Sequence, residues 1–343
     1  MSTARNIIVF NKLGDNMDTD IKVSVLCTAY NHGPYLRQTL ESFVGQQTDF
    51  PFEILVNDDC STDDSAQILR EFAQRYPDRI RPFYQPVNLY SQGVNLYVQV
   101  LYPNARGRYF AICEGDDCWT DPQKLQLQAD FLDAHPDYSA CVHNTVGRHL
   151  DHSQPDGPLF PQTGDRDVPF SLVLRGMGGA FHTSSVMARR EVLLSLPDFR
   201  DVGHSYGFTD YPAGLWMTMC GRVRFLDRCM SEYRIGSNAS AWSTGVGKNY
   251  KKLLRFVRGE IAVLDALAPH VQAEQAREVQ QVRREREYEL LYLTGDVKTM
   301  MRPPYREIYR QKPLSHRMIT ALKAAFPGLH RLYRRKKGFL EEG

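Results

Sequence analysis

Two adjacent aspartates, Asp116 and Asp117, follow the short apolar run 109–113 after one glutamate and one glycine. Neighbouring carboxylates beside a buried strand repel each other, and each raises the pKa of the other unless a cation or a donor-rich ligand lies between them. Hard oxygen ligands of this kind suit Mg²⁺ or Mn²⁺. The pattern therefore predicts a divalent-metal site. The alternative is that Asp117 or Thr120 only caps the helix expected near Pro122.

The elements that would position these carboxylates are strands that alternate with helices. Strands are expected at Lys22–Cys27, Phe52–Val56, Ile80–Tyr84 and from Tyr109 onward, and helical spacing separates them. This alternation predicts a parallel sheet with right-handed crossovers, in which the carboxyl ends of the strands share one edge. Ligands of such sheets bind in the crevice outside that edge.

The shared edge would bring Thr28, Tyr30 and Asp58 next to Asp116 and Asp117. An aromatic ring can stack on a base, and a carboxylate can accept a hydrogen bond from a base or a ribose hydroxyl. No phosphate-binding glycine motif follows the first strand, so a diphosphate would be bound through the metal. The structural alternatives are packing of Tyr30 on the next helix and an Asx-turn or cap for Asp58.

Three ordered motifs resemble those of a family 2 glycosyltransferase of the GT-A type. They are VSVLCTAYN at 23–31, FEILVNDDCSTDDS at 52–65 and EGDDCWTDPQKLQLQADFL at 114–132. The resemblance covers about 23–242 and is more specific in the amino-terminal half. It implies an α/β fold of the GT-A type, Rossmann-like, with a mostly parallel central sheet and flanking helices.

The resemblance also implies roles for the residues of the crevice. Thr28, Tyr30 and Asp58 would bind the base of the donor nucleotide. Asp116 would bind the ribose, and Asp117, with Asp116 beside it, would bind Mn²⁺ or Mg²⁺.

The second half of the chain would receive the acceptor. Asp210 precedes an apolar helix expected at 213–220, where the resemblance implies the catalytic base and the alternative is a helix cap. His182 lies in an expected inner strand, 180–187, where it would line the acceptor pocket or be a structural residue. Arg234 follows two short strands expected within 222–233 and is a candidate contact of the acceptor or the diphosphate. Many relatives place a histidine just after the Tyr-Arg pair, but this chain has Gly236.

The function implied is an inverting glycosyltransferase that moves a sugar from a nucleotide-diphospho-sugar to an acceptor hydroxyl. Its expected setting is the synthesis of bacterial surface polysaccharide or glycoconjugate, with a saccharide or lipid-linked saccharide as acceptor. One alternative is a sugar-phosphate nucleotidyltransferase, although such enzymes usually open with a glycine-rich, basic loop where this chain has TAYNHG. The other is a catalytically silent nucleotide-sugar-binding or scaffold protein, for which Gly236 is the only hint.

Composition narrows the setting. The net charge is only +2, and no basic-aromatic interleaving indicates a nucleic-acid partner. The seven cysteines form no CxxC pair, which favours reduced thiols in the cytoplasm over a disulfide or zinc framework. No leader-like segment opens the sequence and no apolar run approaches the length of a membrane span. We therefore expect a cytoplasmic protein, soluble or peripheral on the inner face of the membrane.

The expected organisation is an extension at 1–20, a glycosyltransferase domain at 21–245 and a helical region with a basic tail at 246–343. Within the domain, 21–122 would bind the nucleotide sugar and 123–245 the acceptor. The charged helix 271–293 is expected to be solvated or to pair with a second chain in a homodimer. The segment 314–337 joins an apolar helix face to a basic cluster, which predicts docking on an anionic membrane. The alternative is that this apolar face packs on the catalytic domain.

Overall fold

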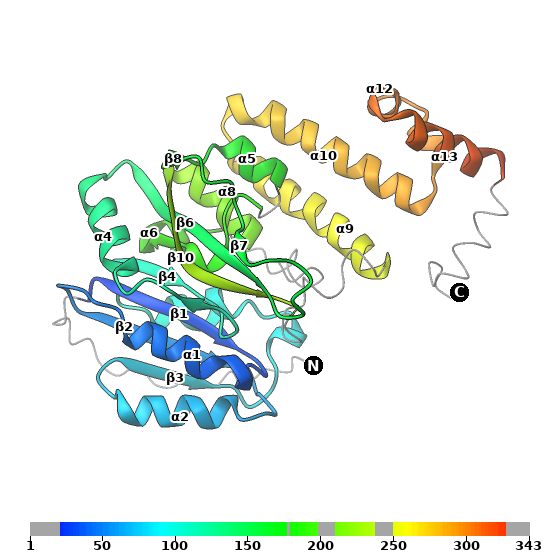
Figure 1. The fold of residues 1–343 in the computed structure, drawn as a ribbon. Helices are drawn as coiled ribbons and strands as arrows, with labels where there is room; N and C mark the ends of the chain where they lie inside the picture. The colour runs from blue at the N-terminus through cyan, green and yellow to red at the C-terminus, as the bar shows by residue number, and fades with distance from the viewer. Residues whose placement is uncertain (1–20, 177–178, 198–209, 237–249, 327–343) are drawn as a thin grey trace, which may run out of the picture.

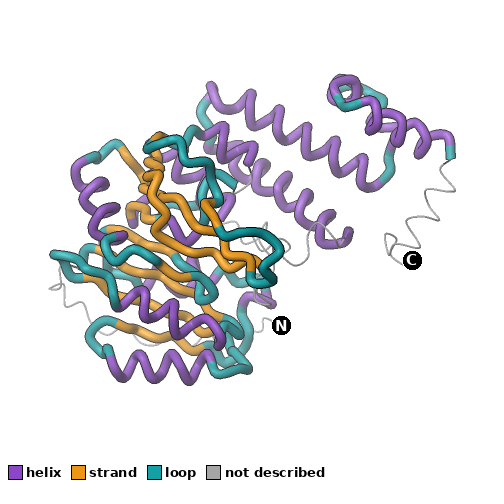
Figure 2. Tube along the Cα trace, viewed as in Figure 1, coloured by secondary structure: helices purple, strands orange, loops and turns teal. Residues whose placement is uncertain are grey.

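The computed structural model describes residues 21–176, 179–197, 210–236 and 250–326. Within these ranges one mixed sheet of ten strands forms the centre of the molecule, and helices gather at the carboxyl end (Figures 1 and 2). The expected extension 1–20 and the expected boundary at 245/246 lie outside the described residues. The division into domains therefore stays a prediction.

The sheet has the order β3-β2-β1-β4-β9-β6-β10-β5, with β7 paired to β6 and β8 paired to β10. The strands of the first half are β1 (Val23–Ala29), β2 (Phe52–Asp58), β3 (Ile80–Tyr84) and β4 (Tyr109–Ile112). All neighbours among these four are parallel, as predicted. Their carboxyl ends therefore lie at one edge, where the candidate donor-binding residues follow.

Strand β1 is apolar along nearly its whole length because it is buried on both faces. Leu26 belongs to one hydrophobic core, whereas Val25 and Cys27 belong to the other. Helices α1 (Gly33–Val44), α2 (Ser65–Arg75) and α4 (Lys124–Ala134) cover the second core. The first core is covered by η2 (Tyr97–Leu101), α3 (Tyr102–Asn104), α5 (Phe170–Gly176), α6 (Arg190–Leu194) and α8 (Asp210–Cys220).

The strands of the second half differ from the sequence-based expectation. The strands observed there are β5 (Cys118–Trp119), β6 (Tyr138–His149), β7 (Gly157–Pro158), β8 (Arg166–Asp167), β9 (Met187–Arg189) and β10 (Arg222–Ile235). The two strands expected within 222–233 are one strand, β10, whose register against β6 shifts between Leu226 and Cys229 and again before Ser231. The polar residues at that irregularity gave the appearance of a break.

The inner strand expected at 180–187 was also wrong in its bounds. A short 3₁₀ turn, η3 (Thr183–Ser185), occupies the middle of that segment, and β9 begins only at Met187. Strand β9 runs antiparallel to both β4 and β6. It therefore joins the donor half of the sheet to the acceptor half.

The carboxyl-terminal helices pack on one another and on the first core. They are α9 (Tyr250–Leu267), η4 (Ala268–His270), α10 (Ala273–Thr294), α11 (Val297–Met300), α12 (Tyr305–Gln311) and α13 (Leu314–Ala325). Val263 and Leu264 of α9 and Val279 and Val282 of α10 extend the first hydrophobic core. One face of the charged helix α10 is therefore buried within the monomer, and the homodimer remains a prediction. Among the described residues no helix is long and apolar enough to cross a membrane.

Candidate active site

A tight turn after β4, residues 113–117, carries the two aspartates, and we call it the acid turn. Backbone contacts from β1 fix its position. The Cys113 amide donates to the Leu26 carbonyl at 3.1 Å, and the Gly115 amide donates to the Thr28 carbonyl at 2.9 Å. The buried Thr39 hydroxyl on α1 lies 3.0 Å from the Gly115 carbonyl and 2.5 Å from the Asp117 carbonyl. The turn is therefore held by buried hydrogen bonds.

Gly115 is required here because neighbouring side chains approach its backbone closely. A Cβ at this position would lie 2.8 Å from His32 Nδ1 and 3.1 Å from Ala29 Cβ. His32 Nδ1 in turn lies 3.9 Å from Asp116 Oδ1. The glycine therefore lets the turn pack directly against the end of β1 and the start of α1.

The Asp117 carboxylate lacks a hydrogen-bond partner. It is buried, and neither of its oxygens has a hydrogen-bond donor. Burial raises its pKa well above the ordinary value, and the charges of Asp116 and Glu114 raise it further. A buried carboxylate with two unpaired oxygens fits a divalent cation.

The described residues would supply only part of the coordination of such a cation. Among the described residues no three His, Cys, Asp or Glu side chains converge as a metal-binding group. A cation bound by Asp117 would therefore take its remaining oxygen ligands from water or from the donor diphosphate.

His182 lies directly beside this carboxylate. Its Nδ1 is 3.7 Å from Asp117 Oδ2 and 2.8 Å from Ser184 Oγ, and its ring packs on Tyr233 with 4.4 Å between centroids. Burial lowers the pKa of His182 to about 4, so its imidazole is neutral near pH 7. The structure thus brings His182 to the acid turn, and its role in an acceptor pocket stays a prediction.

Arg234 makes internal contacts, and its expected contact with the diphosphate or the acceptor stays a prediction. The side chain is buried, and its Nη1 donates to the Asp116 carbonyl at 2.5 Å. Its Nη2 donates to Gln38 Oε1 at 2.6 Å. In this structure Arg234 positions the backbone of the acid turn.

The residues expected to bind the nucleotide lie at the ends of β1 and β2. Asp58 is buried; its Oδ2 accepts from the Ser61 amide at 3.3 Å, and its Oδ1 has no partner. The Tyr30 ring is exposed, contrary to the alternative that it packs on the next helix. The Thr28 hydroxyl is directed at the Tyr97 hydroxyl, 3.5 Å away. Asp58 and Tyr30 thus offer a buried, unpaired acceptor oxygen and an exposed aromatic ring.

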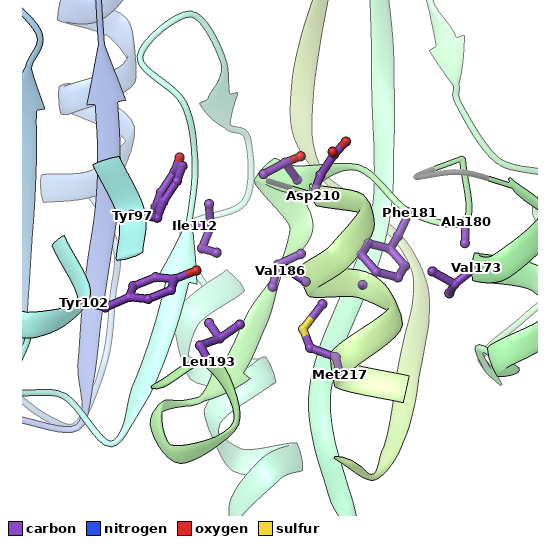
Figure 3. A pocket seen from close by; sticks show the side chains of 13 residues that line it. Tyr97, Tyr102, Ile112, Val173, Ala180, Phe181, Val186, Leu193, Asp210 and Met217 are labelled. Atoms are coloured by element: carbon purple, nitrogen blue, oxygen red, sulfur yellow. The ribbon is translucent and has the colours of Figure 1, made fainter. Parts of the chain in front are cut away.

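Asp210 is the first residue of α8 and lines a small pocket of about 30 Å³ (Figure 3). Ile112 at the end of β4 and Tyr97 line the same pocket, so Asp210 lies near the carboxyl edge of the sheet. The residue Asp210 is exposed at the surface. The protein around its carboxylate nevertheless displaces water from that group, and this desolvation raises its pKa. The rest of the lining is largely apolar, with Val186, Leu193 and Met217 among its members (Figure 3).

Glu114 connects the acid turn electrostatically to Asp210. Burial raises the pKa of Glu114 to about 8, and the charges of Asp116 and Asp210 add to the increase. The charges of Glu114 and Asp210 also raise the pKa of Tyr90, after burial. These carboxylates therefore lie within electrostatic range of one another although they come from different parts of the chain.

Sequence reasoning assigned no role to Glu114, Tyr90 or Tyr97. Glu114 stands in the same motif as the two aspartates, and its position at the end of a buried strand was a usable signal. No comparable sequence pattern marked the tyrosines. The segment of Tyr90 is held by Asp59, and that contact appears only in the tertiary structure. The Asp59 carboxylate accepts from the amides of Leu89 and Tyr90 at 2.8 and 3.0 Å.

Comparison with known proteins defines the class that this fold and site represent. The model of glycosyl transferase family 2 matches residues 24–180. A putative teichuronic acid biosynthesis glycosyltransferase of Bacillus subtilis, TuaG, is 32% identical over 227 residues, 63% of this chain and 80% of that protein. An uncharacterized protein of Mycobacterium tuberculosis is 31% identical over 256 residues, 75% of this chain and 70% of that protein. This chain belongs to glycosyl transferase family 2.

Solved structures agree in fold. Staphylococcus aureus TarS 1–349 in complex with UDP has a TM-score of 0.52 and 16% identity, covering 87% of this chain and 77% of that one. The mannosyltransferase PcManGT from Pyrobaculum calidifontis, in complex with GDP-Man and Mn²⁺, has a TM-score of 0.53 and 16% identity. This match covers 94% of this chain and 87% of that one. The protein is a glycosyltransferase with a GT-A-like fold and additional carboxyl-terminal helices.

Proposed function

We propose that this glycosyltransferase transfers a sugar from a nucleotide-diphospho-sugar to an acceptor hydroxyl with inversion at the anomeric carbon. The observation that carries the proposal is the pocket that Asp210 shares with Ile112, the last residue of β4 before the two aspartates. It indicates that the donor-binding turn and a carboxylate fit for base catalysis face one crevice. Inversion then requires one base and no protein nucleophile.

The donor nucleotide would bind at the ends of β1 and β2. Tyr30 would stack on the base, Thr28 would line its pocket, and Asp116 would accept from the ribose. Asp58 has one unpaired oxygen, which suits a base with a single ring N–H donor, as in uracil or thymine. Guanine presents two adjacent donors and would leave one without a partner.

Asp117 would hold the cation, Mn²⁺ or Mg²⁺, next to Asp116. When bound, the cation would offset the charge that develops on the departing diphosphate. His182, 3.7 Å from Asp117, would contribute a neutral imidazole to the same metal–diphosphate site. It would take the place of the histidine that Gly236 replaces. Gly236 has a positive φ of +87°, which a histidine would adopt only with strain.

Asp210 would act as general base. It would accept the proton of the acceptor hydroxyl as that oxygen attacks the anomeric carbon, a contribution of roughly 10²–10⁴-fold. Glu114, with a pKa of about 8, would be protonated near neutral pH. This would leave Asp210 as the carboxylate that accepts the proton.

The acceptor would be a saccharide or a lipid-linked saccharide of a bacterial surface polymer. The relative TuaG, a putative glycosyltransferase of teichuronic acid biosynthesis, supports this class. All seven cysteines are free thiols, which fits a cytoplasmic location.

The test is to incubate the full chain with UDP-, dTDP- and GDP-sugars in the presence of Mn²⁺, Mg²⁺ or EDTA. Release of nucleoside diphosphate that depends on metal and acceptor, with inverted product configuration by NMR, is expected. Release of pyrophosphate from sugar phosphate and nucleoside triphosphate would identify a nucleotidyltransferase. Donor binding without turnover across acceptor panels would favour the silent binding protein.

A further inference from the structure

Helix α13 exposes its apolar side chains. Leu314, Met318 and Leu322 follow one another at four-residue intervals, and Ile319 and Phe326 broaden the same stripe. These five side chains are between 46% and 68% exposed. We call them the α13 stripe. Its apolar side chains do not pack on the catalytic domain, contrary to the structural alternative considered for this segment.

The polar side of α13 faces the protein instead. The His316 ring stacks on Tyr292 with 4.2 Å between centroids, and its Nε2 lies 3.0 Å from the Tyr288 hydroxyl. Lys323 Nζ lies 3.4 Å from the centroid of the Tyr292 ring, and Thr320 is buried. The polar contacts thus fix the orientation of the helix, and the α13 stripe is directed outward.

The segment that carries the stripe is strongly basic. Residues 297–326 contain seven Lys and Arg and one acidic residue, Glu307, although the whole chain has a net charge of only +2. Six of these basic side chains are exposed. They are Lys298, Arg302, Arg306, Arg310, Lys312 and Arg317. The ion pairs found in the described helical region involve Arg175, Arg283 and Arg286 instead.

We propose that the α13 stripe and these basic residues dock the enzyme on an anionic membrane surface. An exposed apolar helix face flanked by Lys and Arg matches a helix that lies in the lipid headgroup region. A second copy of this chain is the poorer partner. A two-fold contact through the stripe would bring two equally basic surfaces together. The sequence beyond the described residues adds five more basic residues within 331–337.

Docking would place the enzyme where a lipid-linked acceptor is found, and the binding itself does not depend on the proposed reaction. The test is flotation of the full chain with phosphatidylglycerol-containing vesicles and with pure phosphatidylcholine vesicles, at low and high salt. Wild type should float with the anionic vesicles at low salt, and less at high salt because salt screens the attraction. Met318→Glu/Leu322→Glu should lower the apparent partition coefficient at least tenfold.

The matched control is Leu194→Glu, at a leucine 47% exposed on α6 of the catalytic domain, which should float like wild type. Circular dichroism and donor binding should be unchanged in both variants, because the substituted positions are on the surface. The proposal is overturned if wild type stays unbound with anionic vesicles at low salt, or if the double variant binds as well as wild type. It is also overturned if sedimentation without lipid shows a wild-type dimer that the double variant abolishes, since the occupant would then be a second copy.

Discussion

His182 Nδ1 lies 3.7 Å from Asp117 Oδ2, which places an imidazole at the buried carboxylate expected to bind metal. The two residues are far apart in the chain and belong to different halves of the sheet. Their contact is possible because β9, which follows His182, pairs antiparallel with β4, which precedes Asp117. The same nitrogen lies 2.8 Å from Ser184 Oγ, so a binding role and a structural role for His182 predict different effects of mutation.

Replacing His182 by alanine should weaken Mn²⁺-dependent binding of a nucleotide diphosphate about tenfold, since the imidazole would leave the metal–diphosphate site. Isothermal titration calorimetry with UDP and Mn²⁺ measures the change, and metal-free UDP binding provides the reference. A structural histidine predicts a different result. The melting temperature would fall while the metal-dependent part of the affinity stayed constant.

Replacing Asp117 by asparagine should abolish the metal-dependent part of donor binding and leave the fold intact. The metal-free protein should become more stable near neutral pH, because the folded state then no longer buries this carboxylate, whose pKa burial raises. Calorimetry with UDP, GDP and dTDP, with and without Mn²⁺, and melting curves in EDTA test both parts. Undiminished metal-dependent binding would exclude Asp117 as a ligand.

Replacing Asp210 by asparagine should lower turnover by about two to four decades, the range of general-base catalysis, with donor affinity nearly unchanged. Asparagine caps helices about as well as aspartate, so a residue that only caps α8 would tolerate the change. The matched control is Asp296→Asn at the N-cap of α11, which should keep full turnover. Near-normal turnover of Asp210→Asn would move the base elsewhere, to Glu232 or to Asp201, which lies outside the described residues.

Replacing Gly115 by alanine should displace the acid turn, because the new Cβ would lie 2.8 Å from His32 Nδ1. We expect a loss of about 1–3 kcal/mol in unfolding free energy and weaker donor binding. Gly157→Ala is the control, since a Cβ there has no neighbour within 4 Å. Chemical denaturation and donor titration of the two variants give the comparison. Equal behaviour of both would show that the turn adapts.

Glu260 on α9 predicts a pH dependence of stability that does not involve the active site. Burial raises its pKa to about 8, although Arg286, 3.6 Å away, opposes the increase. The folded state therefore retains a proton that the unfolded chain has lost between about pH 4 and pH 8. Stability should fall with rising pH across this window, by at most about 1.4 kcal/mol per pH unit for one proton, and level off above it.

Glu260→Gln should flatten this part of the pH profile and stabilise the protein at pH 8. Arg286 keeps a partner in Glu289 at 2.9 Å, so its charge would not be left unpaired. Glu307→Gln, at an exposed carboxylate, is the control. Denaturation curves from pH 4.5 to 8.5 test the difference between variants. Parallel profiles for wild type and Glu260→Gln would show that Glu260 is already ionised in the folded protein.

The residue pattern of 21–122 was sufficient to predict the first half of the sheet. Fully apolar strands ending in acidic and hydroxyl residues specify buried parallel strands with functional groups at one edge, and local patterning is sufficient for that inference. The strand arrangement of residues 123–245 depends on tertiary contacts. Strand β10 continues through a register shift, where the local sequence pattern predicted a break between two strands. The position of β9 in the sheet is set by its pairing with strands that are distant in sequence. Only that pairing brings His182 to Asp117.

The same division applies to the helical end. The spacing of apolar residues predicted the apolar stripe of α13. The same spacing is found in a helix whose apolar face is buried and in one whose apolar face is exposed to solvent. The contacts of His316 and Lys323 with Tyr292 decided the orientation, because a ring and a cation find partners on α10 that the apolar side chains do not. The burial of a side chain depends on which other segment of the chain packs against it. The sequence of one helix does not specify that other segment.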